Sequence, residues 1–248
     1  MRLFVTGSSS SFVREILSKI DNVKIVPIKN LTNSESDKMK FDSSSLQAFK
    51  KNDKIIHAAW NMRNRNEMSS NNINVKGSIK FFDSLPKTQK KNFVLVSSVA
   101  AKTVSVYGRH KKKVEEHVLN NGGSVIRLGI LYCESSNNLK FLKDLKNASK
   151  YLPFIPNFSG NKKIFYITTP KNIENFLINF KENVIINCVE ENSVSFKYLI
   201  KNILKIRKPI LNFPFWLGYG IVLLLNKIFS DFLITSDSFL YIKTMNKK

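Results

Sequence analysis

Short apolar runs alternate with helix-like stretches through the first half of the chain, and this alternation limits the fold more than any other feature. The strands are expected at Leu3–Thr6, Val23–Ile28, Lys54–Ala59, Phe93–Ser97 and Ser124–Leu128, and the helices at Phe12–Ile20, Asn72–Leu85 and Tyr107–Leu119. A repeated strand–helix–strand order favours a parallel sheet with right-handed crossovers. Ligands are then expected at the carboxyl ends of the strands.

The pattern is less regular beyond residue 135. Helices are expected at Leu139–Leu152 and Phe196–Ile206, and strands at Lys163–Ile167 and Val184–Cys188. We therefore expect a core over residues 1–135 and a smaller mixed α/β region over residues 136–248.

The most apolar stretch is Ile210–Phe229, which Pro214 and two glycines interrupt. Its uninterrupted part is well short of the roughly 20 residues of a membrane-spanning helix. A buried or partly buried helix is the main expectation. A helix lying in a membrane surface between flanking lysines is the main alternative, and a true span is the least favoured one.

The charge is strongly positive, with 40 lysines and arginines against 18 acidic residues and a formal net charge of +22. Most of these cations are lysines scattered along the chain, whereas phosphate and base recognition tends to recruit arginine. We interpret the charge as compositional bias, with an anionic membrane as the alternative and nucleic acid as the least expected partner. Two cysteines are too few for a disulfide framework, and the first residues lack a signal-peptide pattern, so we expect a cytoplasmic protein.

The first expected strand leads directly into a glycine turn, Thr6-Gly7-Ser8-Ser9-Ser10-Ser11-Phe12-Val13. A glycine allows a sharp turn, and the free N–H groups of the following helix can bind a pyrophosphate. A full dinucleotide fingerprint has two further glycines. Ser10 and Val13 occupy their places here, or Ser11 and Arg14 if one residue is inserted. By itself the turn is equally compatible with a serine-capped helix that binds nothing.

Tyr107 and Lys111 are four residues apart in an expected helix and therefore share a face. A nearby ammonium stabilises the phenolate, so the phenol can act as an acid or a base near neutral pH. Upstream, Ser98 follows an expected strand, and its hydroxyl can hold a substrate oxygen during hydride transfer. A serine turn that only closes the strand is the alternative.

The order of TGSSSSFVREIL, DKIIHAAW, NVKGS, FVLVSSVAA, YGRHKKKVEE and VIRLGILY resembles the extended short-chain dehydrogenase/reductases. Within them it is most similar to the NAD-dependent epimerase/dehydratases that act on nucleotide sugars. The resemblance covers about residues 1–135, and LPFIP, ITTPKNIENFL and ITSDSF are less specifically similar to the substrate-side half. It implies a Rossmann-like, doubly wound parallel sheet with a small C-terminal substrate-side subdomain. It also implies a homodimer formed through the helices at Asn72–Leu85 and Tyr107–Leu119.

The same resemblance implies roles for individual residues. Tyr107 would be the catalytic acid–base, Lys111 its partner and a contact of the nicotinamide ribose, and Ser98 the holder of the reacting oxygen. Gly7, Ser10, Phe12 and Val13 would line the pyrophosphate turn, and Asp42 would lie near the adenine. The remaining implied cofactor contacts are Ala58, Ala59, Asn74 and Gly129. Two departures from the family are the missing glycines and a short stretch between Ser98 and Tyr107.

The cofactor is expected to be NAD or NADP. A carboxylate at the end of the second strand would favour NAD, but this chain has Pro27-Ile28-Lys29-Asn30 there. Lys29 can meet a 2′-phosphate, which slightly favours NADP, or it is one more lysine in a lysine-rich chain. No metal site is expected, because His57, His110 and His117 are scattered, and His57 is interpreted as structural.

These features predict an NAD(P)-dependent oxidoreductase or epimerase acting on a nucleotide sugar. Val99 and Ala100 follow Ser98 where dehydratases of this family often have an acidic pair, so an epimerase or a reductase fits better. Two alternatives stay open. One is a non-catalytic dinucleotide-binding protein with an eroded glycine loop, and the other is a basic module that contacts nucleic acid or a membrane.

Overall fold

A six-stranded parallel sheet forms the centre of the computed structural model, which describes residues 1–29, 41–42, 44–62, 72–135, 139–159, 162–214 and 216–217. The strands lie in the order β10-β5-β4-β3-β1-β2. Their bounds are Arg2–Thr6 (β1), Lys24–Ile28 (β2), Lys54–His57 (β3), Phe93–Ser98 (β4), Ser124–Leu128 (β5) and Ile185–Cys188 (β10). The order reverses beside β1, so the expected doubly wound α/β fold is confirmed.

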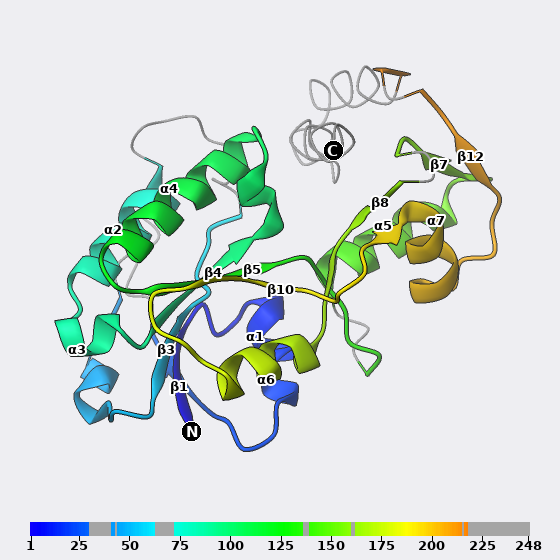
Figure 1. Cartoon of the computed structure of the whole chain (residues 1–248). Helices are drawn as coiled ribbons and strands as arrows, with labels where there is room; N and C mark the ends of the chain where they lie inside the picture. Colours follow the sequence, from blue (N-terminus) through cyan, green and yellow to red (C-terminus); the bar gives the residue numbers. More distant parts are fainter. Residues whose placement is uncertain are drawn as a thin grey trace.

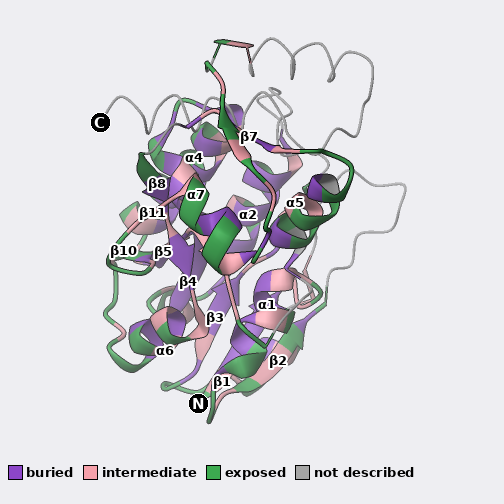
Figure 2. Cartoon of the chain, turned by 90° about the vertical axis from the view of Figure 1, so that its right-hand side faces the viewer, coloured by how far each residue is buried: buried purple, intermediate pink, exposed green. Residues whose placement is uncertain are grey.

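Helices cover both faces of this sheet (Figure 1). Helices α2 (Ile73–Asp83) and α4 (Val106–Asn120) lie on one face, and α1 (Ser11–Glu15) and α6 (Pro170–Ile178) on the other. The alternation of side chains along β1 explains the two cores. Leu3 and Val5 pack with α1 and α6, whereas Phe4 packs with α2 and α4. Figure 2 shows that the central strands are largely buried.

The first expected helix is shorter than predicted. Helix α1 ends at Glu15, and a separate 3-10 turn follows at Leu17–Lys19. Ile16 between them has φ −117° and ψ −63°, which departs from helical geometry. Strand β3 also ends earlier than predicted, at His57. The Ala58 N–H still donates to the Thr6 carbonyl, but the Ala59 N–H donates to the Thr6 hydroxyl instead of a backbone carbonyl.

The second half of the chain both completes the sheet and builds a separate region. Strand β10 pairs with β5, so the sheet takes its last strand from beyond residue 135. The predicted strand Lys163–Ile167 is divided into β8 and β9 at Tyr166, whose carbonyl accepts the Ile130 N–H at 2.7 Å. The expected helix at Phe196–Ile206 is a short helix followed by a π-helical turn.

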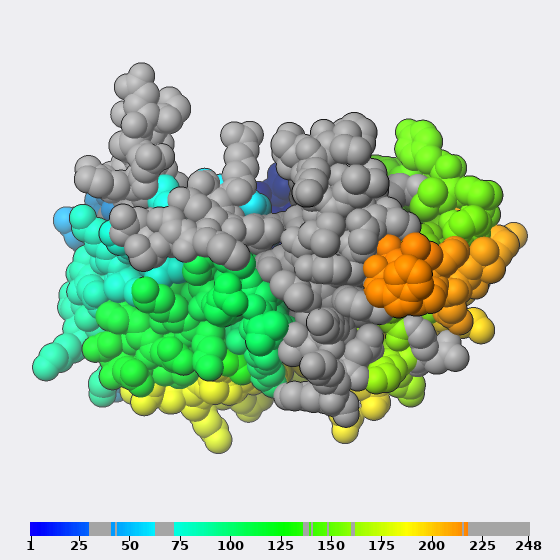
Figure 3. Space-filling view, turned by 90° about the horizontal axis from the view of Figure 1, so that it is seen from above, coloured from blue at the N-terminus to red at the C-terminus, as the bar shows by residue number. Residues whose placement is uncertain are grey.

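The smaller region has its own apolar cluster, which includes Leu139, Ile155, Leu199 and Ile200. Seen from above, the green residues around α4 and the orange residues near β12 lie at opposite ends of the molecule (Figure 3). The elements of the second half and the short elements not yet bounded are η2 (Ser44–Ala48), α3 (Lys87–Lys90), η3 (Val99–Lys102), β6 (Ile130–Leu131), α5 (Lys140–Lys150), β7 (Ile155–Asn157), β8 (Lys163–Phe165), β9 (Ile167–Thr168), β11 (Val194–Ser195), α7 (Phe196–Tyr198), its π-helical turn η4 (Leu199–Ile203) and β12 (Ile210–Asn212).

The apolar stretch Ile210–Phe229 is described only up to Leu217, without residue 215. Ile210–Asn212 does not begin a helix as expected. It forms strand β12 and pairs in parallel with β7, where the Ile155 N–H donates to the Pro209 carbonyl. Residues 218–229 of the stretch lie outside the described residues. Among the helices that the structure describes, none combines the length and apolarity needed to cross a membrane.

Candidate functional site

Ser98 is the last residue of β4, and Tyr107 lies in the helix that follows it. Two serine caps, Ser98 and Ser105, determine how the chain turns between them. The Ser98 hydroxyl accepts the Ala100 N–H at 3.2 Å and starts the turn η3. The Ser105 hydroxyl accepts the Gly108 N–H at 3.0 Å and starts α4, so Tyr107 falls in the first turn of that helix. A Cβ on Gly108 would lie 2.3 Å from the Ala100 carbonyl oxygen. This glycine therefore lets α4 lie directly against η3.

Lys111 lies one turn further along α4 and is only 5% exposed. Its Nζ donates to the Val96 carbonyl of β4 at 2.9 Å. It also lies 3.7 Å from the centroid of the Trp60 ring and 5.9 Å from that of Tyr107. Burial lowers the pKa of Lys111 to about 7, and the nearby charge of Glu115 opposes this shift. The structure thus brings the predicted Tyr107–Lys111 pair together beside a strand end.

Trp60 belongs to this group, although the sequence analysis did not identify it. Its ring meets the Tyr107 ring edge to face, with the centroids 5.9 Å apart. Trp60 follows Ala58 and Ala59 at the end of β3, next to the site that the strand order defines. This position could have identified Trp60 from the sequence. The loop after a central strand is where a ligand is expected, so an aromatic residue in that loop is a candidate for the site.

Glu115 anchors the helix face that carries Lys111. Its carboxylate accepts a hydrogen bond from the Ser97 hydroxyl at 2.5 Å and pairs with Arg127 at 2.6 Å. The Glu115 side chain is 2% exposed and that of Arg127 is 16% exposed. This buried ion pair joins α4 to β4 and β5. Sequence reasoning missed it because Glu115 and Arg127 are on different elements.

The glycine turn has the sharp geometry that the sequence predicted. Gly7 has φ +70°, and a Cβ there would lie 2.7 Å from the Ala59 nitrogen. Ser10 caps α1, and its hydroxyl accepts the Val13 N–H at 3.4 Å. The side chains of Phe12 and Val13 are buried in the core with Leu3 and Val5. Of Phe12 and Val13, therefore, only the backbone could contact a ligand at the turn.

Two buried polar groups fix the end of β3 around this turn. Asn74 in α2 is fully buried, and its amide accepts the Asn61 N–H at 2.5 Å and donates to the Asn61 carbonyl at 3.0 Å. His57 is hydrogen-bonded to Thr6 at 2.8 Å and to Ser78 at 2.9 Å. Burial, with a smaller effect of the Lys111 charge, lowers the pKa of His57 to about 3. His57 is therefore neutral at physiological pH and links β1, β3 and α2, in agreement with the structural role expected.

The other predicted cofactor contacts form separate local groups. At the end of β2 the Asp42 N–H donates to the Lys29 carbonyl at 2.9 Å. Hydrogen bonds from Ser44 hold the pKa of the Asp42 carboxyl below its usual value, and the Lys29 charge adds to this. After β5, the Gly129 N–H donates to the Thr168 hydroxyl at 2.8 Å, and a Cβ there would lie 2.2 Å from the Tyr166 carbonyl oxygen.

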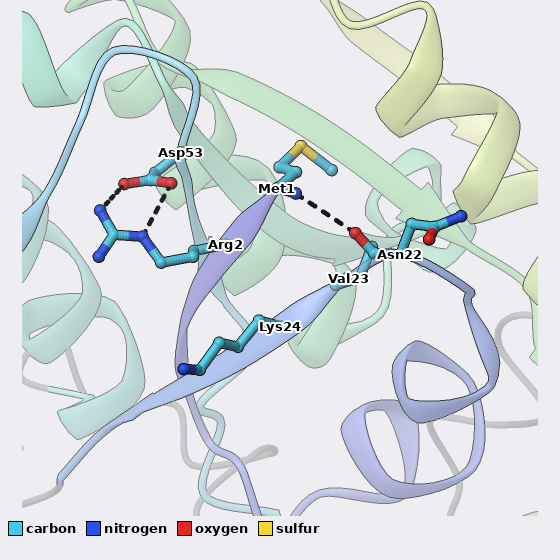
Figure 4. Close-up of a pocket in the computed structure, with 6 residues that line it drawn as sticks. All are labelled: Met1, Arg2, Asn22, Val23, Lys24 and Asp53. Atoms are coloured by element: carbon cyan, nitrogen blue, oxygen red, sulfur yellow. Dashed lines mark hydrogen bonds and ion pairs between the residues drawn. The ribbon is translucent and has the colours of Figure 1, made fainter.

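A shallow pocket lies at the opposite end of the sheet, where β1 and β2 begin (Figure 4). Met1, Arg2, Asn22, Val23, Lys24 and Asp53 line it. Arg2 and Asp53 form an ion pair at 2.5 Å within it. Ligands of doubly wound sheets bind at the carboxyl ends of the strands, so we do not assign the candidate site to this pocket. Over the described ranges, no three His, Cys, Asp or Glu side chains gather as a metal site would require.

No family model matches the sequence, and no curated protein matches it. Solved structures do match. A UDP-N-acetylglucosamine 4-epimerase from Bacillus cereus has a TM-score of 0.61 at 14% identity, with 86% of this chain and 88% of that chain covered. A dTDP-4-dehydrorhamnose reductase from Clostridium acetobutylicum has a TM-score of 0.58 at 16% identity, with 86% and 84% covered. A dTDP-glucose 4,6-dehydratase from Bacillus anthracis, in complex with NAD, has a TM-score of 0.57 at 14% identity, with 86% and 84% covered.

At these identities the likeness shows the fold alone. The described chain therefore has the Rossmann-like fold found in nucleotide-sugar epimerases, reductases and dehydratases.

Proposed function

We propose that this chain binds NAD or NADP and catalyses hydride transfer at a hydroxyl-bearing carbon of a nucleotide sugar, as an epimerase or a reductase. The observation that carries the proposal is the buried Lys111 ammonium beside the Tyr107 ring, at the carboxyl end of β4. A buried cation next to a phenol is the arrangement that makes a phenolate available near neutral pH. The likeness to epimerases and reductases supports the same chemistry.

The residues around Gly7 are compatible with a dinucleotide. The two larger side chains near the missing glycines, Phe12 and Val13, pack into the core and so do not fill the turn. Gly7 and Ala59 lie against each other, which keeps the turn narrow. In this proposal the backbone of Gly7–Val13, with the Ser10 hydroxyl, holds the pyrophosphate, and Asn74 acts by fixing the loop after Ala58 and Ala59.

The proposed mechanism uses three side chains. The Tyr107 phenolate takes the proton of a sugar hydroxyl, while the Ser98 hydroxyl donates a hydrogen bond to the same oxygen. The hydrogen on the carbon leaves as hydride, and the carbon–oxygen bond becomes a carbonyl. A bound nicotinamide supplies the hydride acceptor, and in the reverse direction the donor. Lys111 stabilises the phenolate by its charge and would contact the nicotinamide ribose.

The turn after Ser98 supports an epimerase or a reductase over a dehydratase. Val99 and Ala101 are buried in η3, and Ala100 between them carries no acidic group. Dehydratases of the family that the sequence resembles often have an acidic pair at this position. We further propose that Gly129 lies near the nicotinamide, and that residues beyond 135 supply the sugar contacts of a homodimeric enzyme.

The choice between NAD and NADP depends on the end of β2. Lys29 is exposed and lies next to Asp42, whose N–H bonds to the Lys29 carbonyl. A free Lys29 ammonium would favour a 2′-phosphate, whereas pairing with the Asp42 carboxylate would favour a free ribose. Lys29→Ala is expected to weaken NADPH binding more than NADH binding if the proposal for NADP is correct.

The test is fluorescence titration of the purified protein with NADH and NADPH, followed by assays with UDP- and dTDP-sugars. Tyr107→Phe should keep cofactor binding and lose turnover by about a hundredfold or more. Tyr151→Phe is a matched control, because Tyr151 is 87% exposed, and should match the wild type. If neither cofactor binds, the proposal fails and the eroded glycine turn has no dinucleotide ligand.

A further inference from the structure

Trp60 contacts both members of the proposed acid–base pair, yet the mechanism above assigns it no role. Its ring lies 3.7 Å from Lys111 Nζ, and the two rings of Trp60 and Tyr107 meet edge to face. Lys111 Nζ is closer to the Trp60 centroid than to the Tyr107 centroid, at 5.9 Å. The indole face is thus the nearest aromatic surface to the charge.

Among the described residues around Lys111, none offers it a carboxylate of its own. Glu115 on the same helix is bound by Ser97 and Arg127, on β4 and β5, and acts on Lys111 only through space. His57 on β3 is neutral near pH 7 and adds no compensating charge. Within the described part of the chain, the ammonium has a hydrogen bond to the Val96 carbonyl and the faces of two aromatic rings. A cation held in this way depends on the quadrupole of the nearer ring.

A second observation concerns the indole N–H. Trp60 Nε1 is buried and has no hydrogen-bond partner in the described chain. Buried Trp N–H groups are usually paired, and leaving one unpaired destabilises the fold. Stability alone therefore does not account for a tryptophan here, since a phenylalanine would fill similar space without that penalty.

We propose that Trp60 is a positioning residue of the acid–base group, whose indole face holds the Lys111 ammonium beside Tyr107 in place of a carboxylate. The inference rests on the proposed function for its catalytic meaning, but the contact itself can be tested without turnover. A carboxylate in this position would bind the ammonium directly and hold it in one ion pair. The indole face attracts the ammonium without accepting a hydrogen bond from it. The ammonium N–H groups that do not bind Val96 therefore stay available to the phenol and the ribose.

The first experiment is NMR of protein labelled with 13C-lysine. The Lys111 signal is identified by its loss in Lys111→Met. We expect its side-chain protons to be shifted upfield by the indole ring, and the signal to titrate near pH 7, well below the ordinary lysine value of 10.5. In Trp60→Leu the upfield shift should disappear and the midpoint should fall by about one pH unit. Trp60→Phe should keep part of both effects.

The matched control is Trp216→Leu, because Trp216 is 72% exposed and lies in another part of the chain. Its Lys111 signal should match the wild type. Backbone spectra of each variant show whether it is folded. If Trp60→Leu is unfolded, Trp60→Phe and the wild-type ring-current shift still decide the contact. An unshifted Lys111 signal in the wild type, or an identical signal in Trp60→Leu, would overturn the inference.

The second experiment separates positioning from packing. In cofactor-dependent turnover, Trp60→Leu should lower kcat about tenfold and move its pH profile, while Trp60→Phe restores much of the rate. A lower rate with an unchanged pH profile would make Trp60 a packing residue and reject the proposal. Absence of turnover in the wild type would count against the proposed function, whereas the NMR result would still stand for the contact.

Discussion

The two ends of the parallel sheet each hold a cation, but in different environments. Arg2, where β1 begins, pairs with Asp53 at 2.5 Å and keeps 29% of its side chain exposed. Lys111, near the end of β4, is 5% exposed and rests on a carbonyl and an indole face. In the Arg2–Asp53 pair each charge is compensated by the other, whereas a buried cation that has no carboxylate partner among the described residues is destabilising. Such a group is most often kept where it takes part in chemistry.

The comparison predicts that removing a charged residue lowers the free energy of unfolding more at the end of the sheet with the buried Lys111 than at the end with Arg2. Glu115→Ala should have the largest effect, because it leaves Arg127 and Ser97 buried without their partner. We expect the free energy of unfolding to fall by about 3–5 kcal/mol, measured in urea. Glu116→Ala is the control, since Glu116 is 62% exposed and pairs with the similarly exposed Lys112 at 3.8 Å. Equal losses of stability in Glu115→Ala and Glu116→Ala would contradict this prediction.

The next effect is a loss of stability in acid that depends on His57. Its pKa is about 3 in the folded chain against an ordinary value of 6.5, so the unfolded chain binds more protons between these values. Stability therefore falls as the pH drops through this window, by about 2 kcal/mol at pH 5. His57→Gln should reduce the difference between unfolding at pH 7 and pH 5 by that amount. An unchanged difference in the variant would show that His57 does not titrate in this way.

A smaller effect on the free energy of unfolding, in the alkaline range, is expected from Lys111. Its pKa is about 7 folded and 10.5 ordinarily, so below pH 7 both states are protonated and above it only the unfolded state is. Stability should rise with pH above 7, by about 1 kcal/mol between pH 7 and pH 8. Lys111→Met removes the group and should be flat over this range in urea unfolding. The comparison would be weakened if wild type and variant had the same slope.

The smallest effect is expected at the open end of the sheet. Arg2→Gln removes the ion pair, but Asp53 keeps the Lys50 N–H at 2.7 Å. Because the Arg2 side chain is 29% exposed while that of Asp53 is only 7% exposed, we expect a loss of stability in urea unfolding that is smaller than that of Glu115→Ala. Added salt should reduce the difference between the wild type and the variant, because it screens a partly exposed ion pair. A loss comparable to that in Glu115→Ala would mean that both ends of the sheet depend equally on their charges.

The parts of the fold that were predictable depend on residues near one another in the sequence. The alternation of apolar runs located all six strands of the sheet, and the four-residue spacing paired Tyr107 with Lys111. The length of the first helix was wrong, because nothing in a single apolar pattern shows that Ile16 leaves helical geometry. The start of the stretch Ile210–Phe229 was wrong as well, because β12 forms only through its partner β7.

By itself, the sequence determined the α/β class, the glycine turn at Gly7 and the Tyr107–Lys111 spacing, because each follows from local periodicity and backbone freedom. Only the tertiary structure decided what surrounds Lys111. Trp60 comes from the loop after β3 and Val96 from β4, and no local pattern links either residue to Lys111. Burial, and with it the pKa of Lys111, depends on where distant segments pack. The spacing thus identified the pair, and the packing of distant segments gave Lys111 its buried environment.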